Sequence, residues 1–413
     1  MVTFRPFQSL SFVVLAFEWL LWPIPHVNSI DDVRLLPLLE KEVGLRKVIR
    51  FVEIANAHRF NDNECLRKMN WTTSSTRPLC LTEEMLHTTT RLMNFKEYTE
   101  KAVTLLGRLH GTPQAKVLGT SYPYISGGIF RAMGETIQET FTHHHWPRSA
   151  KATHFKHYYA WADLDFPNRS MVYWNLNQFK KDIEYLKEWL LGGRIKSHFF
   201  IITHNQDRPG YPDWLLDHPQ VLLVFGHHVP ANLYHPKIRV IPLGVDNPAK
   251  SPYLLHKVRM EAKSDKYDHT PQNLLLARFR MDLGHLRPII SKAIQANFQD
   301  LPHQKLSKVQ YYKELTRTKF IISPPGIGWE SSKATESHYM GRVPLIMDLF
   351  RNDSLVGLPF LTIKEEEWPS VTPAWLEAKW DSFMADDRRI FNVDKTWGLW
   401  WLTYVLKECL MVQ

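Results

Sequence analysis

A glycine-rich stretch between two apolar runs carries the residues best suited to hold a phosphate. It reads SPPGIGWESSKATESHYMGRVPLIM. Gly326 and Gly328 lack side chains, so a ligand can come close to the backbone there. A helix capped by Ser331 or Ser332 would present unpaired N–H groups to an anion, and Lys333 in its first turn adds a positive charge. The pattern favours phosphate binding, but a simple turn between two strands also explains it.

Glu336 lies one helical turn beyond Lys333 on the same predicted face. A carboxylate in this position can accept hydrogen bonds from two ribose hydroxyls, as acidic residues do in other nucleotide-binding folds. The alternative is an i,i+3 ion pair between the two side chains on a solvated helix surface. The residues alone leave both interpretations open.

Two polar residues that follow a buried apolar run are candidates for a general base. His204 and Asp207 come directly after this run, and either side chain can take a proton from a hydroxyl group. Asp207 is the first candidate and His204 the second. The alternatives are a turn residue before Pro209 for Asp207 and a hydrogen-bonded core histidine for His204.

Three arginines near a later apolar run are candidates for neutralising the charge of a leaving group. They are Arg278, Arg280 and Arg287. Ordinary surface charge is the alternative for each of them.

Clusters of histidine and aspartate raise the question of a metal site. The histidines at 143–145 and 227–228 are adjacent in sequence, and adjacent histidines rarely point at one ion. Asp163 and Asp165 form an Asp-x-Asp pattern, a match so short that it is common by chance. We therefore predict a site without a metal.

The composition is typical of a globular protein with two or more domains: of 413 residues, 44% are hydrophobic and 23% charged. The formal net charge of +9 is spread out, with no block of five or more consecutive basic residues. This argues against a nucleic-acid-binding tail, and we expect no nucleic-acid partner. A diffuse positive field suits anionic small ligands, phosphates or acidic glycans, although solubility alone also explains it.

Residues 1–29 resemble a secretory targeting segment. Arg5 precedes an apolar run from Leu10 to Trp22 that Glu18 interrupts. Such a run is short for a membrane span and fits a signal peptide better. An uncleaved signal-anchor and a buried core helix are the alternatives. The first two interpretations predict a secreted or type II membrane protein of the ER or Golgi lumen, with membrane contact only through this segment.

Cysteines and glycosylation signals agree weakly with a lumenal location. Cys65 and Cys80 can close a short disulfide loop, which leaves Cys409 over. Three sites share the Asn-x-Ser/Thr pattern of a glycosylation acceptor: Asn70, Asn168 and Asn352.

The periodicity changes from helical to α/β near residue 115. Residues 30–110 have helix-like apolar spacing and indicate a helical stem or accessory region. Beyond them, short apolar runs alternate with helical segments, which predicts parallel sheets with helices on both faces. Helices are expected within residues 127–141 and 178–193. Strands are expected within residues 115–124, 197–207, 220–229, 237–247, 272–281, 319–326 and 343–348.

The polar segment 260–273 is the best candidate for a linker between two similar halves. The predicted organisation is a targeting segment 1–29, a helical region 30–110, doubly wound Rossmann-like domains at 111–258 and 259–395, and a C-terminal helix 396–413. Such domains bind ligands beyond the carboxyl ends of their strands, at the switch point where the strand order reverses. We therefore expect the polar residues described above to gather in a cleft between the domains.

The stretch FIISPPGIGWESSKATESHYMGRVPLIMD resembles the nucleotide-sugar motif of exostosin-like glycosyltransferases, glycosyltransferase family 47 and its relatives. That motif runs from an apolar strand through Pro-Pro-Gly-x-Gly-x-Asp-x-x-Arg-x-Trp-Glu to a glycine, a proline and a buried strand. Four further segments resemble family segments in the same order: FFIITHNQD, HPKIRVIPLGVDN, LLLARFRMDLGHLRPIISKAI and LVGLPFLTIKEEEWPSVTPAWLEAKW. The similarity covers roughly residues 195–405.

This resemblance implies a GT-B architecture, in which an acceptor domain and a nucleotide-sugar domain face a cleft. It implies an inverting, metal-independent transfer of a sugar from a UDP- or GDP-linked donor to a glycan or glycoprotein acceptor, with no cofactor besides the donor. By position, Gly326 and Gly328 face the diphosphate, Glu336 holds the ribose and Arg287 approaches the donor. The full set expected at the donor is Arg278, Arg280, Arg287, Ser323, Gly326, Gly328, Glu330, Lys333 and Glu336.

Three positions depart from the family pattern. The usual aspartate is Glu330, the usual arginine is Lys333 and the usual tryptophan is Thr335. Lys333 keeps the charge but loses the two-pronged geometry with which arginine binds phosphate. The departures motivate a second hypothesis, a catalytically inactive glycan- or nucleotide-binding relative. A third is an unrelated two-domain α/β enzyme or periplasmic-type binding protein, in which the loop only turns the chain.

Overall fold

The computed structural model describes residues 38, 42, 44–60, 92–105, 124–134, 136–138, 166–174, 176, 181–204, 206–207, 209–245, 251–262, 270–298 and 306–412. Several predictions concern residues outside these ranges. They are the targeting segment 1–29, the Cys65–Cys80 pair, the sequon at Asn70, the strand at 115–124 except for Tyr124, the histidines 143–145 and the aspartates 163 and 165.

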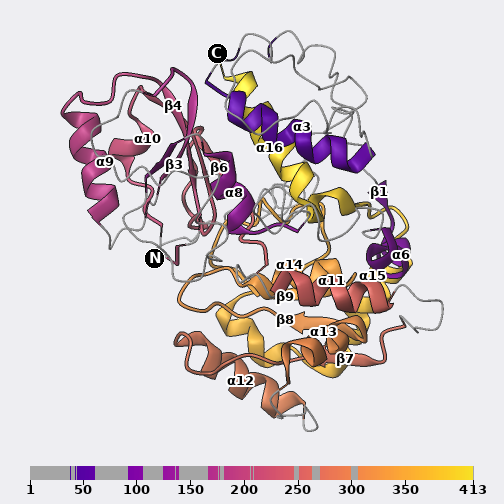
Figure 1. Ribbon diagram of the computed structural model, residues 1–413. Coiled ribbons are helices and arrows are strands. Elements are labelled where there is room, and N and C mark those ends of the chain that lie inside the picture. The colour runs from indigo at the N-terminus through magenta and orange to yellow at the C-terminus, as the bar shows by residue number, and fades with distance from the viewer. Residues whose placement is uncertain are drawn as a thin grey trace, which may run out of the picture.

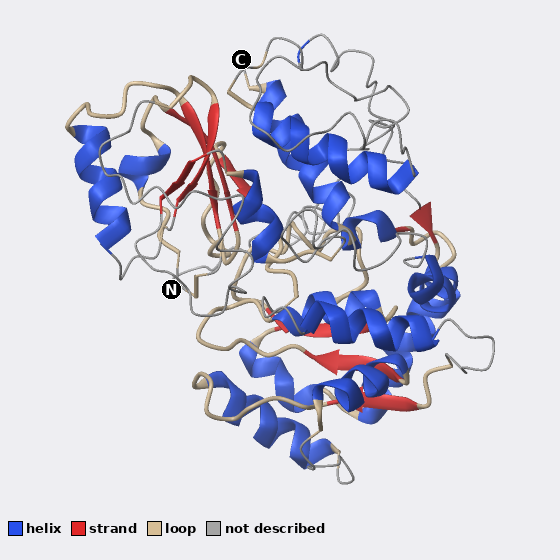
Figure 2. Cartoon of the chain, in the orientation of Figure 1, coloured by secondary structure: helices blue, strands red, loops and turns tan. Residues whose placement is uncertain are grey.

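Two parallel sheets form the framework of the chain, which confirms the predicted α/β class (Figure 2). The first sheet consists of β2 (Thr136–Gln138), β3 (Ser170–Trp174), β4 (Phe199–Thr203), β5 (Val221–Gly226) and β6 (Ile238–Val240). The second sheet consists of β7 (Asn273–Leu276), β8 (Thr318–Ile322), β9 (Val343–Met347) and β10 (Leu361–Ile363). In each sheet, every neighbouring pair of strands is parallel.

The first sheet is buried on both faces, and its apolar residues alternate between two cores. Met171 and Tyr173 of β3 belong to one core, and Val172 and Trp174 to the other. Helices α9 (Lys181–Leu191) and α10 (Asp213–Leu216) cover one face, and α3 (Arg46–Phe60), α8 (Gly127–Met133) and α16 (Gly398–Met411) cover the other. Burial on both faces explains why the strands are continuous apolar runs.

The second sheet is also covered on both faces (Figure 1). One face packs against α6 (Phe95–Leu105), α12 (Leu286–Asn297), η3 (Glu365–Ser370) and α15 (Pro373–Ala385). The other packs against α11 (Ser251–Ala262), α13 (Lys308–Thr316) and α14 (Ser332–Tyr339). A small third sheet pairs β1 (Leu92–Met93) with β11 (Phe391–Asn392), and η4 (Val393–Thr396) leads into α16.

Strand order departs from the doubly wound expectation. The order is β2-β3-β4-β5-β6 in the first sheet and β10-β9-β8-β7 in the second. Strands consecutive in sequence are therefore neighbours throughout, and the described strands contain no reversal of order. The expected switch point is absent from this part of the chain, so the site has to be sought at the ends of neighbouring strands.

The predicted helix at 127–141 is wrong in its second half. Helix α8 ends at Met133, and the Gly134 N–H closes it by donating to the Arg131 carbonyl. The next described residues, Thr136–Gln138, form β2 and pair with β3. Backbone pairing with β3 at the edge of the first sheet outweighs the helical spacing of these residues.

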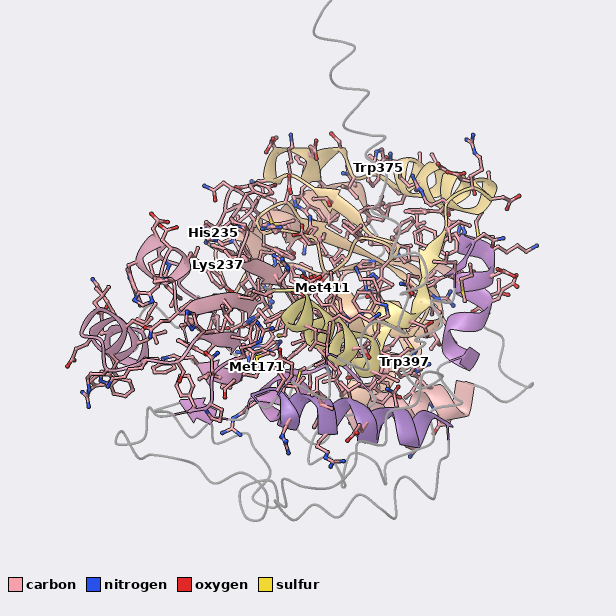
Figure 3. The ribbon with its side chains drawn as sticks, turned by 90° about the horizontal axis from the view of Figure 1, so that it is seen from above. Met171, His235, Lys237, Trp375, Trp397 and Met411 are labelled. Carbon is pink, nitrogen blue, oxygen red and sulfur yellow. The ribbon has the colours of Figure 1, made fainter. Side chains whose placement is uncertain are left out.

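The regions predicted outside the two domains form part of their cores. Helix α3, from the region expected to be a stem or accessory, packs on the first sheet, and α6 packs on the second. The C-terminal helix is present as predicted, and α16 returns from the second sheet to cover the first. Trp397 and Met411, labelled in Figure 3, mark the two ends of α16.

Within the described residues, no helix has both the length and the apolar character needed to cross a membrane. Cys409 is buried in α16, and its sulfur is not part of a disulfide bond. Of the two described sequons, Asn168 is exposed and Asn352 is partly buried.

Candidate functional site

The carboxyl ends of the two sheets face each other. Pro230, which follows β5, forms an antiparallel bridge with Phe350, which follows β9. The Arg351 N–H donates to the Val229 carbonyl over 2.8 Å. Because parallel α/β sheets bind ligands beyond the carboxyl ends of their strands, this junction is the candidate site.

The glycine loop, residues 323–331, leaves β8 and leads directly into α14 at this junction. The Gly326 N–H donates to the Gly328 carbonyl over 2.8 Å. Ser331 is the N-cap of α14, as predicted, with its hydroxyl accepting from the Lys333 N–H over 3.5 Å. Gly341 follows the helix with φ of 69°, the left-handed conformation predicted for it. The loop therefore presents the start of a capped helix to the facing sheet.

Arg287, which was expected to approach the donor, binds the backbone of the glycine loop. Its Nε donates to the Pro325 carbonyl over 2.6 Å and its Nη1 to the Arg280 carbonyl over 2.9 Å. A Cβ on Gly326 would lie 3.3 Å from Arg287 Nη2. The guanidinium is buried, and most of its contacts are with the loop itself.

The other two predicted arginines differ in their surroundings. Arg280 is exposed and pairs with Asp282, with 3.0 Å between Nε and Oδ1. Arg278, just beyond β7, is partly buried. Its guanidinium has no hydrogen-bond or ion-pair partner among the described residues. Arg278 is therefore the better placed of the two to meet an anionic ligand.

Glu330 joins the glycine loop to the first sheet. Both of its carboxylate oxygens lie 3.1 Å from the Leu243 N–H, which lies shortly after β6. Its own N–H donates to His228 Nδ1 over 2.9 Å. Burial raises the pKa of this carboxyl group to about 8, against an ordinary value of 4.5, and the Leu243 hydrogen bond partly opposes that rise. Glu330 thus links the two sheets, besides standing at a predicted donor position.

Glu336 is fully buried and pairs with Lys308, so the alternative of a surface ion pair with Lys333 is wrong. Its Oε1 accepts from Lys308 Nζ over 2.8 Å and from the Tyr312 hydroxyl over 3.0 Å. Neither its Oε2 nor the Tyr311 hydroxyl makes a hydrogen bond of normal geometry. Burial raises the pKa of Tyr311, and so do the nearby Glu336 carboxylate and a hydrogen bond of poor geometry to it. The two side chains therefore lie close together, and a partner that aligns better with either oxygen could replace this weak bond.

Lys333 lies beside this cluster. Its Nζ is 4.0 Å from the centre of the Tyr311 ring. Burial lowers the pKa of Lys333 to about 8, while Glu336 acts in the opposite direction. The amine is therefore mostly charged at neutral pH. Ser323, at the start of the glycine loop, is a further buried group, and its hydroxyl lacks a hydrogen-bond partner.

The two candidate bases have contrasting environments. His204 is buried, with Nε2 3.0 Å from the Pro242 carbonyl and its ring stacked on His227 at a centroid distance of 4.3 Å. This is the placement of a core histidine. Asp207 is exposed, and its backbone oxygen would lie 3.1 Å from a Cβ on Gly328. Asp207 therefore lies exposed, with its backbone beside the glycine loop.

Three further residues at this junction were not predicted as site residues. Tyr311 and Lys308 surround Glu336, but they come from α13, a helix that no sequence motif connected with the loop. His228 was considered only as a metal ligand. His228 lies just after an apolar strand, as the candidate base His204 does, and this position could have marked it as a site residue. Among the described residues, no group of three or more histidine, cysteine or acidic side chains is arranged to hold a metal ion.

Comparison with known proteins adds no family assignment. No family model matches the chain, and no curated protein matches it.

Proposed function

We propose that the chain is a glycosyltransferase of GT-B architecture that transfers a sugar from a UDP- or GDP-linked donor to a glycan or glycoprotein. The observation that carries the proposal is the contact between the glycine loop and the carboxyl ends of β5 and β6, through Glu330, His228 and Leu243. Two parallel sheets whose carboxyl ends meet at a capped helix start are suited to a phosphorylated ligand. The motif resemblance supports the same reading.

The donor would bind through its diphosphate and its ribose. The N–H groups at the start of α14, with the positive charges of Lys333 and Arg278, would meet the diphosphate. Glu336 Oε2 and the Tyr311 hydroxyl, both buried and without a normal hydrogen bond, would meet the ribose hydroxyls. Each group has a physical reason to gain a partner on binding.

Transfer requires a base and a stabilised leaving group. The acceptor hydroxyl oxygen would attack the anomeric carbon, and the bond from that carbon to the diphosphate oxygen would break, with inversion. The hydroxyl proton would pass to the carboxylate of Asp207, an exposed residue whose backbone lies beside the glycine loop. Lys333 and Arg278 would stabilise the negative charge that develops on the departing diphosphate.

A thermal-shift panel of UDP, GDP and their sugar conjugates tests this proposal on the full chain. We expect stabilisation by one nucleotide series and sugar release or transfer with the matching conjugate. No stabilisation by any nucleotide would count against the proposal. Binding that survives Glu336→Ala would reject the ribose role, and Glu261→Ala, which removes an exposed ion-paired glutamate, is the matched control.

Nucleotide binding without sugar release over hours would favour the non-catalytic relative instead. The proposal also includes an ER or Golgi lumenal location, for a secreted or type II membrane protein. Mass spectrometry of the mature N-terminus tests whether residues 1–29 are removed.

A further inference from the structure

His228 has an unusual backbone conformation beside the glycine loop. It follows β5, its side chain is 2% exposed, and its φ of 52° lies in the left-handed region. Residues other than glycine seldom adopt this region. Strained conformations persist where the surrounding structure holds them, and they cluster at ligand sites. Contacts with the surrounding structure therefore hold the His228 backbone in a conformation that costs free energy.

One hydrogen bond fixes which nitrogen of the His228 ring carries the proton. Nδ1 accepts from the Glu330 N–H over 2.9 Å. An accepting ring nitrogen is unprotonated, so the proton of the neutral ring is on Nε2. Burial, with a smaller effect from His204, lowers the pKa of His228 to about 3. The ring is therefore neutral at physiological pH and carries a single N–H group.

That N–H group is on the side of the ring that meets the glycine loop. A Cβ on Gly328 would lie only 2.6 Å from Nε2, so the absence of a side chain at Gly328 allows this approach. Within the part of the chain that the structure describes, nothing accepts a hydrogen bond from Nε2. Although the residue as a whole is buried, Nε2 is not among the fully buried side-chain atoms that lack a partner, so it keeps some contact with solvent and a ligand can reach it.

We infer that His228 is a ligand-binding residue contributed by the first sheet, whose Nε2–H donates a hydrogen bond to a phosphate oxygen held on the glycine loop. The inference rests on the proposed function and adds to it a contact from the opposite side of the junction. A nitrogen that already carries a proton cannot act as a base. His228 therefore binds the phosphate and leaves the removal of the acceptor proton to another group.

Two substitutions separate the roles of the two ring nitrogens. His228→Asn keeps a hydrogen-bond acceptor near the Nδ1 position and tolerates a left-handed backbone, but it has no donor near the Nε2 position. His228→Gln extends an amide N–H toward the Nε2 position. The control is His235→Asn, because His235, labelled in Figure 3, is a partly exposed histidine away from the glycine loop. Its imidazole pairs with Asp217.

The experiment is isothermal titration of the full chain and its variants with UDP, GDP and inorganic pyrophosphate, after thermal unfolding has established that each is folded. For every probe that the wild type binds, we expect His228→Asn to raise the Kd at least tenfold with little change in Tm. His228→Gln should recover part of the affinity, and His235→Asn should change nothing. A Kd within twofold of the wild type for His228→Asn would overturn the inference.

The outcomes also separate this inference from the proposed function. If the wild type binds none of the three probes, both fail together. If it binds but the His228 variants bind equally well, only the inference fails. If His228→Asn does not fold, the titration of this variant is replaced by a measurement on the wild type, namely hydrogen exchange at the imidazole C2 position. Bound pyrophosphate should slow exchange at His228 and not at His235, and unchanged exchange at His228 would contradict the inference.

Discussion

The carboxyl group of Glu330 connects the glycine loop to the first sheet in a buried environment. It accepts a hydrogen bond from the Leu243 N–H, and the backbone N–H of Glu330 donates to His228 Nδ1. Removal from water raises its pKa to about 8. A buried carboxyl group that holds its proton until pH 8 makes the attachment of the loop sensitive to pH.

The first prediction concerns the pH dependence of stability at Glu330. Between pH 4.5 and about 8, this carboxyl is ionised in the unfolded chain but protonated in the folded one. The unfolded state then binds fewer protons than the folded state. The contribution of Glu330 to the free energy of unfolding therefore falls as pH rises through this window, by at most about 1.4 kcal/mol per pH unit. Above pH 8 the contribution levels off.

Glu330→Gln removes this proton exchange and provides the comparison. Urea unfolding of both proteins at pH 5, 6, 7 and 8 should give a difference, wild type minus variant, that declines steadily with pH. A difference that is constant from pH 5 to 8 would mean that the Glu330 carboxyl is ionised in the folded protein as well.

At the scale of elements, the two glycines of the loop have different roles. Gly328 lies against the His228 ring, which the Glu330 N–H holds in place. Gly326 lies against the end of the Arg287 side chain. A new methyl group would therefore meet a fixed ring in one case and the tip of a longer side chain in the other.

The second prediction follows from these contacts. Gly328→Ala would place Cβ 2.6 Å from His228 Nε2, whereas Gly326→Ala would place it 3.3 Å from Arg287 Nη2. Gly328→Ala should lower the free energy of unfolding by roughly 1–3 kcal/mol, as overpacking does, and Gly326→Ala by less. Urea denaturation of the two variants side by side gives the comparison. Equal losses would show that the loop adjusts to both.

Most elements of the α/β region could be predicted because their signals are local. Strands such as β4 and β9 are short apolar runs with polar ends, and Ser331 and Gly341 mark the limits of α14. The capped helix after the glycine loop was predicted for the same reason. In each case, residues next to each other in the sequence are enough to predict where the strand or helix begins and ends.

The contacts within the site could not be predicted, because they join residues far apart in sequence. Lys308 and Glu336 are on different helices, and Glu330 reaches Leu243, which follows strand β6 of the other sheet. Arg287 has the charge expected of a donor ligand, yet its place beneath the loop depends on carbonyl groups at Pro325 and Arg280. Strand order likewise depends on how crossovers pack, which apolar periodicity does not encode.

At the scale of the whole molecule, α16 ties the two sheets together. Trp397 at its start packs at a tilt against Tyr339 of α14, with 5.8 Å between ring centres, and the body of the helix covers the first sheet. Tyr339 in turn accepts from the Ile125 N–H over 2.8 Å. These contacts predict that both sheets unfold in one cooperative transition.

The third prediction tests this coupling. Trp401 is buried in α16, and its Nε1 donates to the Lys395 carbonyl over 2.8 Å. Trp401→Ala should lower the free energy of unfolding by about 3–5 kcal/mol while keeping one transition. Trp400→Ala, at the partly buried neighbour, should cost less than half as much. Circular dichroism during urea unfolding measures both, and two separate transitions in the wild type would contradict the coupling.

The most direct measurement is isothermal titration of the full chain with UDP and GDP, each compared with its monophosphate. If the glycine loop and α14 hold a diphosphate, one diphosphate binds with a stoichiometry near one. Its monophosphate then binds at least tenfold more weakly, because it lacks the second phosphate that Lys333 and Arg278 would meet. Failure of both diphosphates to bind, or equal affinity for the monophosphates, would contradict a nucleotide-sugar site at this junction.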